Sequence, residues 1–204
     1  MNTRKQILQI TQTAMLLAIA VLSQAYLTNL LGGPGSPAAQ LAVGSIVNFC
    51  LVLAALACGF WSGAAISGFT PFIAFLLGRV QWPQQILVLA LGNAALVFVF
   101  WLICNKKIFG KNSNDTFNWG VAAVLGSFAK FAVLWFGMTR IFIQFVLTPA
   151  LADEPQRLVN MTATITAMFT WPQLATALTG CIIAGVVYRV LKPVLHGKMI
   201  HVQN

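Results

Sequence analysis

Acidic side chains are almost missing from this sequence. Only three occur among 204 residues, Asp115, Asp153 and Glu154, and charged residues of both signs make up 7% of the chain. Soluble domains carry about 25% charged residues, so water alone is not the solvent in which this chain folds. Hydrophobic residues account for 59% of the chain, and the mean hydropathy is +0.84. These values predict an integral membrane protein, with residues 1–204 forming a single membrane domain.

Several chemical motifs are also missing, and each absence argues against a class of function. A proton- or sodium-coupled carrier usually places Asp or Glu inside the membrane, yet all three acids lie in expected loops. The sequence contains neither a GxxxxGKS nor a GxxxxGKT loop for ATP, and it lacks HExxH and GxSxG. The four cysteines lie in apolar runs without a CxxC pair, which favours free thiols. We therefore expect no enzyme activity, no cofactor and no metal site.

Six apolar segments are long enough, or nearly so, to cross a bilayer, which takes about 20 helical residues. The sequence thus predicts an all-α bundle of six transmembrane helices. Their expected ranges are 8–31, 41–58, 63–77, 86–104, 119–147 and 161–191. The third range is short and ends at Gly78, so we expect it to be tilted, kinked or only partly spanning. Pro172 should kink the sixth helix and free the carbonyl of Met168 from its helical partner.

The basic residues are concentrated at the chain ends and in one loop. The net charge of +9, distributed in this way, suits an anionic membrane surface better than a nucleic acid. With the N-terminus in the cytoplasm, eight basic residues fall on the cytoplasmic side, and only Arg79 and Arg157 fall on the other. This bias predicts that both termini are cytoplasmic. Loops 32–40, 78–85 and 148–160 would then face outward, and membrane lipids would be the surface partners.

Lys130 is a charged residue in the middle of the fifth apolar segment. A charge at bilayer depth costs about 2.5–3.5 kcal/mol on insertion scales. At about 3.6 residues per turn, Gly126, Gly137 and Gln144 lie within about 40° of Lys130, and Arg140 lies about 80° away. This stripe should face the protein interior, because lipid cannot satisfy it. No interior acid can pair with Lys130, so backbone carbonyls, water or a bound solute must do so.

Other polar side chains lie at matching depths in the remaining segments. We predict substrate-binding roles for seven residues: Asn48, Thr70, Asn93, Lys130, Gln144, Trp171 and Gln173. They would form an outward-facing pocket for a small polar solute, with Lys130 donating to a carboxylate or another strong acceptor. The alternative role for each amide or hydroxyl is a tie between neighbouring helices, which is common in membranes. Arg140 could instead extend outward to Asp153 or Glu154.

The first apolar segment carries small residues at helical spacing. Ala14 and Ala18 are four residues apart in the stretch TAMLLAIA, near a basic start. Small residues at this spacing let another helix approach closely. Because the chain lacks an energy source of its own, we interpret Ala14 and Ala18 as a docking face for a partner protein.

These features together resemble a known family. The six spans, the length of about 200 residues, the stretch from Ala14 to Ala18, and the segments GSIVNF, TPFIAFLLG, LGN and FTWPQLATALTG are similar to the substrate-binding S components of energy-coupling factor (ECF) transporters. The resemblance implies a multi-pass protein of the bacterial cell membrane that binds a vitamin or precursor at its outer face. Gly32–Gln40 would cap the site. Ala14 and Ala18 would meet a transmembrane coupling (T) component, which works with two cytoplasmic ATPases.

The substrate does not follow from the resemblance, because pocket residues in such a family vary with the ligand. A buried lysine without an acid favours an anionic solute, and pantothenate fits this best. Hydroxymethylpyrimidine, a neutral ring, would suit the amides and Trp171 instead, and another micronutrient remains an alternative. A stand-alone channel or facilitator is the competing class. It would require polar residues that continue to the cytoplasmic end, whereas the inner parts of the segments are mainly apolar.

Overall fold

The computed structural model describes residues 3–106, 108 and 115–200, with side chains described as far as residue 191. Lys107 and Lys111 of the basic loop lie outside the described residues. Within these ranges the chain is helical and contains no strand. The all-α prediction is therefore confirmed.

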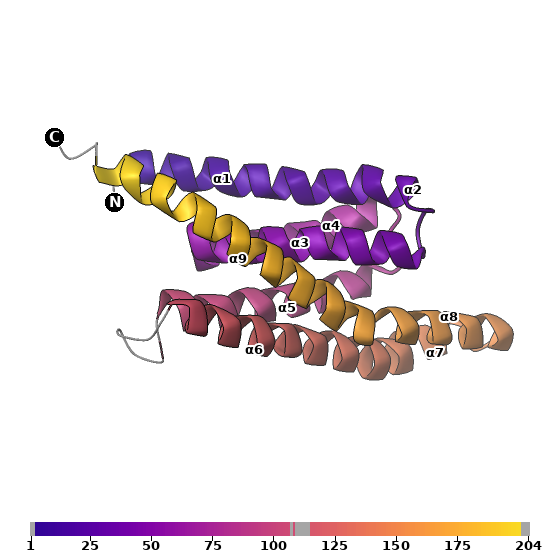
Figure 1. Ribbon diagram of the computed structural model, residues 1–204. Helices are drawn as coiled ribbons and strands as arrows, with labels where there is room; N and C mark the ends of the chain where they lie inside the picture. The colour runs from indigo at the N-terminus through magenta and orange to yellow at the C-terminus, as the bar shows by residue number, and fades with distance from the viewer. Residues whose placement is uncertain (1–2, 107, 109–114, 201–204) are drawn as a thin grey trace.

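Long helices run back and forth along the bundle (Figure 1). The α-helices are α1 (Thr3–Leu22), α2 (Thr28–Leu30), α3 (Pro37–Ala57), α4 (Phe60–Leu76), α5 (Pro83–Phe100), α6 (Asp115–Trp135), α7 (Thr148–Ala150), α8 (Pro155–Met168) and α9 (Trp171–Ile200). A π-helical turn (Ser23–Leu27) joins α1 to α2, and a longer π-helical stretch (Phe136–Leu147) joins α6 to α7. A further π-helical turn (Trp101–Asn105) follows α5. Proline begins α3, α5 and α8, where its missing N–H costs no helical bond.

Five of the resulting helical segments are long and apolar enough to span a membrane: Thr3–Leu30, Pro37–Ala57, Pro83–Asn105, Asp115–Ala150 and Pro155–Leu191. The remaining apolar helix, Phe60–Leu76, has 17 residues. It corresponds to the third predicted span and is short, as expected. Gly59 and Gly78 flank it with φ values of 96° and 69°, a left-handed conformation that glycine adopts readily. The chain is therefore a multi-pass membrane protein with five to six apolar helices.

The start of α1 and the end of α9 lie at the same end of the bundle (Figure 1). We call this the terminal end. The opposite end, which carries the turns at residues 31–36, 77–82 and 151–154, is called the distal end. The closest helix pairs are α3 with α9, α5 with α6, and α4 with α5. Glycine permits the first of these contacts, because a Cβ on Gly180 would lie 2.7 Å from the carbonyl oxygen of Ser45.

An apolar cluster occupies the middle and the terminal half of the bundle. Its members come from α1, α3, α4, α5, α6 and α9, and the largest fully buried ones include Leu51, Ile66, Leu96 and Phe100. In a membrane such burial stabilises the bundle through close packing between helices, because lipid is as apolar as these side chains. Buried polar side chains lie mostly towards the distal end, so the two halves of the bundle differ in chemistry.

The sixth predicted span is interrupted at Phe169 and Thr170, which separate α8 from α9. The ring of Pro172, in the first turn of α9, cannot donate the helical bond that the Met168 carbonyl would otherwise accept. That carbonyl instead accepts from Gln40 Nε2 at 2.8 Å and from Gln173 Nε2 at 3.3 Å. The predicted freeing of the Met168 carbonyl is confirmed.

Candidate binding site

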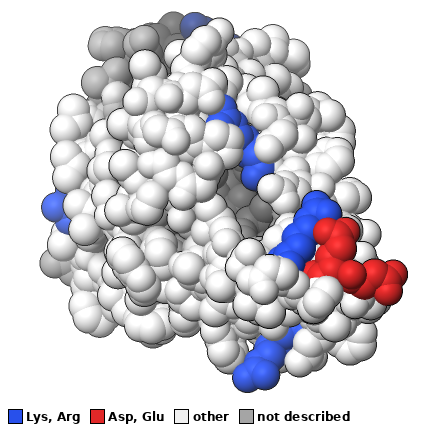
Figure 2. Space-filling view, turned by 90° about the vertical axis from the view of Figure 1, so that its right-hand side faces the viewer, with Lys and Arg blue, Asp and Glu red and all other residues white. Residues whose placement is uncertain are grey.

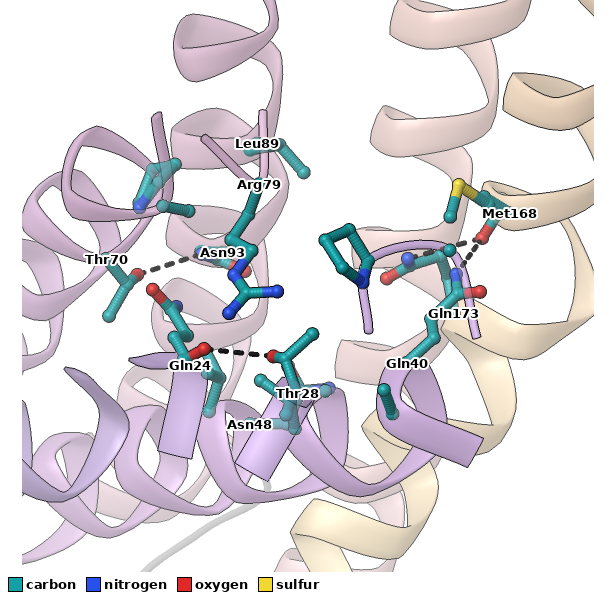
Figure 3. Close-up of a pocket in the computed structure, with 18 of the residues that line it drawn as sticks. Gln24, Thr28, Gln40, Asn48, Thr70, Arg79, Leu89, Asn93, Met168 and Gln173 are labelled. Atoms are coloured by element: carbon teal, nitrogen blue, oxygen red, sulfur yellow. Dashed lines mark hydrogen bonds between the residues drawn. The ribbon is translucent and has the colours of Figure 1, made fainter. Parts of the chain in front are cut away.

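A cavity of about 230 Å³ lies inside the distal half of the bundle. Its walls come from the π-helical turn after α1, the turn at residues 31–36, and helices α3, α4, α5, α6 and α9 (Figure 3). Polar side chains line the two ends of this cavity, and Val43, Val47 and Leu89 are among its apolar walls. A space lined by so many elements can contact a small solute from several sides.

Lys130 lies at the inner end of the cavity and is only 4% exposed. Its ammonium donates to Asn48 Oδ1 at 2.5 Å and to Asn93 Oδ1 at 2.6 Å. The amide nitrogens donate onwards at 3.4 Å, that of Asn93 to Thr70 Oγ1 and that of Asn48 to Thr176 Oγ1. These five residues form what we call the amide floor.

The amide floor is held by five different helices, because its members belong to α3, α4, α5, α6 and α9. Each amide oxygen points at the ammonium, since the amide nitrogen is engaged by a hydroxyl on the other side. Amide dipoles stabilise the charge of Lys130 without neutralising it, and the described lining contains no acid. An ammonium has more donors than the two amides use, so the floor can still donate to a solute.

Arg79, in the turn that follows α4, lines the cavity on its distal side. Its Nη2 donates to Asn29 Oδ1 at 2.9 Å and to the carbonyl of Ala25 at 3.3 Å. The Nε and Nη1 atoms of Arg79 are buried without a partner, as is Oε1 of Gln24. Figure 3 shows the Arg79 guanidinium extending into the space between Asn93 and Thr28. We call Arg79 and Gln24 the mouth pair.

The turn at residues 31–36 covers part of the cavity, with Pro34, Gly35 and Ser36 in its lining. Ser36 Oγ donates to the carbonyl of Leu31 at 2.6 Å, which closes the turn on itself. Gln40, one turn into α3, bonds the Met168 carbonyl and so ties this region to α8. This arrangement agrees with the cap expected over Gly32–Gln40.

A wider hollow of about 660 Å³ leads from the cavity towards the distal surface. The two spaces share Pro34, Gly35, Arg79, Leu89 and Met168 in their linings. Figure 2, which looks onto the distal end, shows a hollow in this face with basic side chains along its rim and the acidic side chains to one side. A solute could therefore enter from the distal end and pass Arg79 before it reaches Lys130.

Five of the seven predicted site residues meet at this cavity: Asn48, Thr70, Asn93, Lys130 and Gln173. Gln144 and Trp171 do not line it. Trp171 is 67% exposed at the start of α9. Residues two apart on a helix point to nearly opposite sides, so Trp171 faces outward because Gln173 faces the cavity.

Gln144 is exposed because the helix changes its geometry after Trp135. The prediction assumed one α-helical period across residues 126–144. Residues 136–147 form a π-helix instead, whose i→i+5 bonds turn the chain through a smaller angle per residue. Gly126, Lys130 and Gly137 remain on the buried side, whereas the slower rotation carries Gln144 away from it.

Arg140 also lies outside the cavity lining and is exposed. Its guanidinium carbon is 5.7 Å from the centre of the Trp135 ring, which is cation–π range. Glu154, which the sequence suggested as a partner for Arg140, instead pairs with Arg157 at 3.1 Å.

The sequence interpretation did not count Arg79 or Gln24 among the seven site residues, and it named Gln40 only as the end of the expected cap. Arg79 was placed in an outward loop by the charge bias, and its bonds to Ala25 and Asn29 depend on how the turn after α4 lies against the π-helical turn and α2. A signal was nevertheless present, because Arg79 is one of only two basic residues predicted on the outer side. An isolated cation at the mouth of a pocket deserves consideration as a solute contact.

A family model for the ECF transporter substrate-specific component matches residues 8–192. The chain belongs to this family. It is therefore an S component, a transporter subunit and not an enzyme, and its family implies association with the T and ATPase components of an ECF transporter. Comparisons with curated proteins and with solved structures give no match.

The predicted docking face of this S component lies on the outer side of α1. Ala14 and Ala18 are both exposed, and so are the neighbouring Met15 and Ile19. Only 17% of the apolar window of the first helix is buried within the chain. A helix with so little of its apolar surface covered leaves room for contact with lipid or with another membrane protein.

Proposed function

We propose that this S component binds a small anionic vitamin or precursor, with pantothenate as the leading candidate, for an ATP-driven ECF importer. The observation that carries the proposal is a cavity whose described lining holds two cations, Lys130 and Arg79, and no acid. A positive site of this kind recognises a solute rich in acceptors. The distal end would face outward, with both termini in the cytoplasm of a bacterial cell.

The size and lining of the cavity support a small, flexible solute. Pockets for drug-sized ligands measure about 300–1,000 Å³, and this one measures about 230 Å³. None of the described lining residues is aromatic. Hydroxymethylpyrimidine would gain from ring stacking, which Trp171 cannot supply from its exposed position. Pantothenate carries a carboxylate, an amide, hydroxyls and methyl groups, which correspond to the mixture of charged, polar and apolar walls.

The apolar cluster in the terminal half argues against a stand-alone channel. A channel needs a polar or hydrated route to both surfaces, but the described residues below the amide floor include Leu51, Leu96 and Phe100, all at most 1% exposed. An S component that its partner subunits move or reshape does not need a continuous polar path across the membrane. Transport by reconstituted protein without any ATPase would support the channel instead.

Calorimetric titration of the detergent-purified chain with a panel of water-soluble vitamins and precursors tests this function. We expect saturable, tight binding of one small carboxylate, with pantothenate first. Tight binding of hydroxymethylpyrimidine would replace the substrate but keep the role. A folded, monodisperse sample that binds none of the panel would contradict the proposed function.

A further inference from the structure

The mouth pair leaves more unmet hydrogen-bonding capacity than the amide floor does. Gln24 is 8% exposed, lines the cavity and has an Oε1 atom without a donor. Arg79 has two buried nitrogens, Nε and Nη1, without an acceptor. Buried polar atoms are rarely left unpaired, because desolvation without a bond is costly. Atoms of this kind in the wall of a cavity mark where a solute supplies the partners.

The position of the Arg79 guanidinium is defined by its third nitrogen. Nη2 bonds Asn29 and the backbone of Ala25, both on the first helical segment. Ala25 lies in the π-helical turn Ser23–Leu27, which also carries Gln24. Such turns inside longer helices often occur at functional sites. The widened turn therefore carries both Gln24, an acceptor in the cavity wall, and Ala25, whose carbonyl helps to hold the Arg79 guanidinium.

The acceptors that Arg79 meets in the protein are a neutral amide and a backbone carbonyl. No carboxylate is present among the described residues that line the cavity. The positive charge of Arg79 therefore lacks a counter-charge there. Lys130, by contrast, already donates two short bonds to Asn48 and Asn93. An anion that enters the cavity therefore gains more binding free energy from Arg79 than from Lys130.

We propose that Arg79 and Gln24 form an anion subsite at the mouth, which fixes the direction in which a bipolar solute binds. The carboxylate accepts from Nε and Nη1 of Arg79, and a neighbouring O–H or N–H of the solute donates to Gln24 Oε1. The far end presents a neutral hydroxyl or carbonyl oxygen to Lys130. This inference rests on the proposed function and adds the orientation of the solute, with the charge outward and the neutral end inward.

Matched pairs of acids and neutral twins test this orientation. The probes are pantothenate with pantothenol, nicotinate with nicotinamide, and biotin with biotinamide, each titrated calorimetrically into the purified full chain. Wild type should bind one acid about 10- to 100-fold more tightly than its twin, as expected for charge-assisted hydrogen bonds. Arg79→Met should remove this preference by weakening the acid alone. Lys130→Met should weaken acid and twin alike.

Two further variants sharpen the test. Gln24→Glu keeps the shape of the side chain but introduces a carboxylate beside Arg79, so it should reverse the preference in favour of the neutral twin. Arg140→Met removes an exposed arginine outside the cavity and should leave both affinities unchanged. The twin's affinity serves as the internal measure of folding for Arg79→Met. If that variant does not purify, Arg79→Gln takes its place, because glutamine can still bond Asn29.

The outcomes separate the two proposals. If wild type binds no member of the panel, the proposed function fails and the subsite fails with it. If wild type binds an acid and its twin equally, the anion subsite is overturned while solute binding stands. The same conclusion follows if Lys130→Met, and not Arg79→Met, abolishes the acid preference, because the carboxylate would then lie at the amide floor.

Discussion

The amide floor and the mouth of the cavity each hold one cation, but the hydrogen bonds of the two cations differ. At the amide floor, Lys130 is enclosed by amide oxygens that other hydroxyls hold in place. At the mouth, Arg79 is anchored through one nitrogen, and its other two remain unbonded. The comparison teaches that the two cations of the cavity, buried Lys130 and half-buried Arg79, serve different purposes. Lys130 holds helices together and donates to a neutral group of the solute, whereas Arg79 binds the negative charge of the solute.

The difference follows from the elements that carry each end. Asn48, Asn93 and Lys130 lie within long helices, whose backbones are fully bonded and whose side chains pack across the bundle. Arg79 and Gln24 lie on a turn and on a π-helical turn. Sites on regular helices are held more accurately than sites on connecting segments. We therefore expect substitutions that shift the helices of the floor to disturb structure and binding together, and those at the mouth to act mainly on binding.

The largest effect is expected for Gly180→Leu, because the new side chain would collide with α3 next to Asn48 of the amide floor. A Cβ at this position would lie 2.5 Å from Asn48 Cβ and 2.8 Å from the backbone nitrogen of Phe49. Overpacking typically costs about 1–3 kcal/mol, and here backbone must move, so α3 and α9 should separate. Thermal unfolding in detergent and titration with the bound vitamin should both show the loss.

Gly68→Leu is the matched control for this change, because nothing lies within 4 Å of a Cβ at Gly68. It should retain the unfolding temperature and the affinity of wild type. A Gly180→Leu variant that matched this control would show that the α3–α9 contact does not position Asn48.

Lys130→Met should have the next largest effect. Loss of a charge-assisted hydrogen bond weakens solute binding by about 1.5–3 kcal/mol, while the methionine fills the space of the lysine stem and keeps the bundle folded. Calorimetric titration measures the change, with Arg140→Met as the control for loss of a positive charge. Unchanged affinity would restrict Lys130 to a structural role between Asn48 and Asn93.

Gln40→Leu should have a smaller effect, confined to the mouth. It removes the 2.8 Å bond to the Met168 carbonyl, which is worth about 0.5–1.5 kcal/mol for a neutral pair. Gln173 still bonds that carbonyl, so the loss should appear chiefly as faster solute release in stopped-flow measurements. Gln84→Leu is the control, because Gln84 is exposed and lines neither the cavity nor the wider hollow. This variant should release solute at the wild-type rate.

Ala14→Trp and Ala18→Trp should have the smallest effect on solute binding, because both alanines are exposed on α1 and do not line the cavity. Their effect should appear in assembly, since a bulky side chain prevents close helix approach. Co-purification with the T and ATPase components, and vitamin uptake in vesicles, should both fall. Ala65→Trp provides an exposed alanine on another helix as control. Normal complexes from the α1 variants would remove Ala14 and Ala18 from the docking face.

Much of the architecture could be predicted from composition and local pattern. Apolar segments of membrane length become helices, because lipid offers the backbone no other partners. The short third helix followed from Gly78 at its end, and Pro172 predicted a kink where the structure has a break. The interior position of Lys130 followed from the cost of exposing a charge to lipid. These conclusions depend on neighbours in sequence or on the solvent, which the sequence alone specifies.

The membership of the site was decided only by the tertiary structure. Gln144 left the predicted stripe because a π-helical stretch altered the rotation of the helix, and Trp171 faced away because α9 starts afresh after a break. Arg79 lines the cavity because its side chain bonds the π-helical turn after α1 and α2. By itself, the sequence determined that this chain spans a membrane, keeps Lys130 inside and offers it no acid. Which side chains share the cavity with Lys130 depended on helix register and on contacts between distant segments, because a rotation of a fraction of a turn moves a side chain from the interior to the surface.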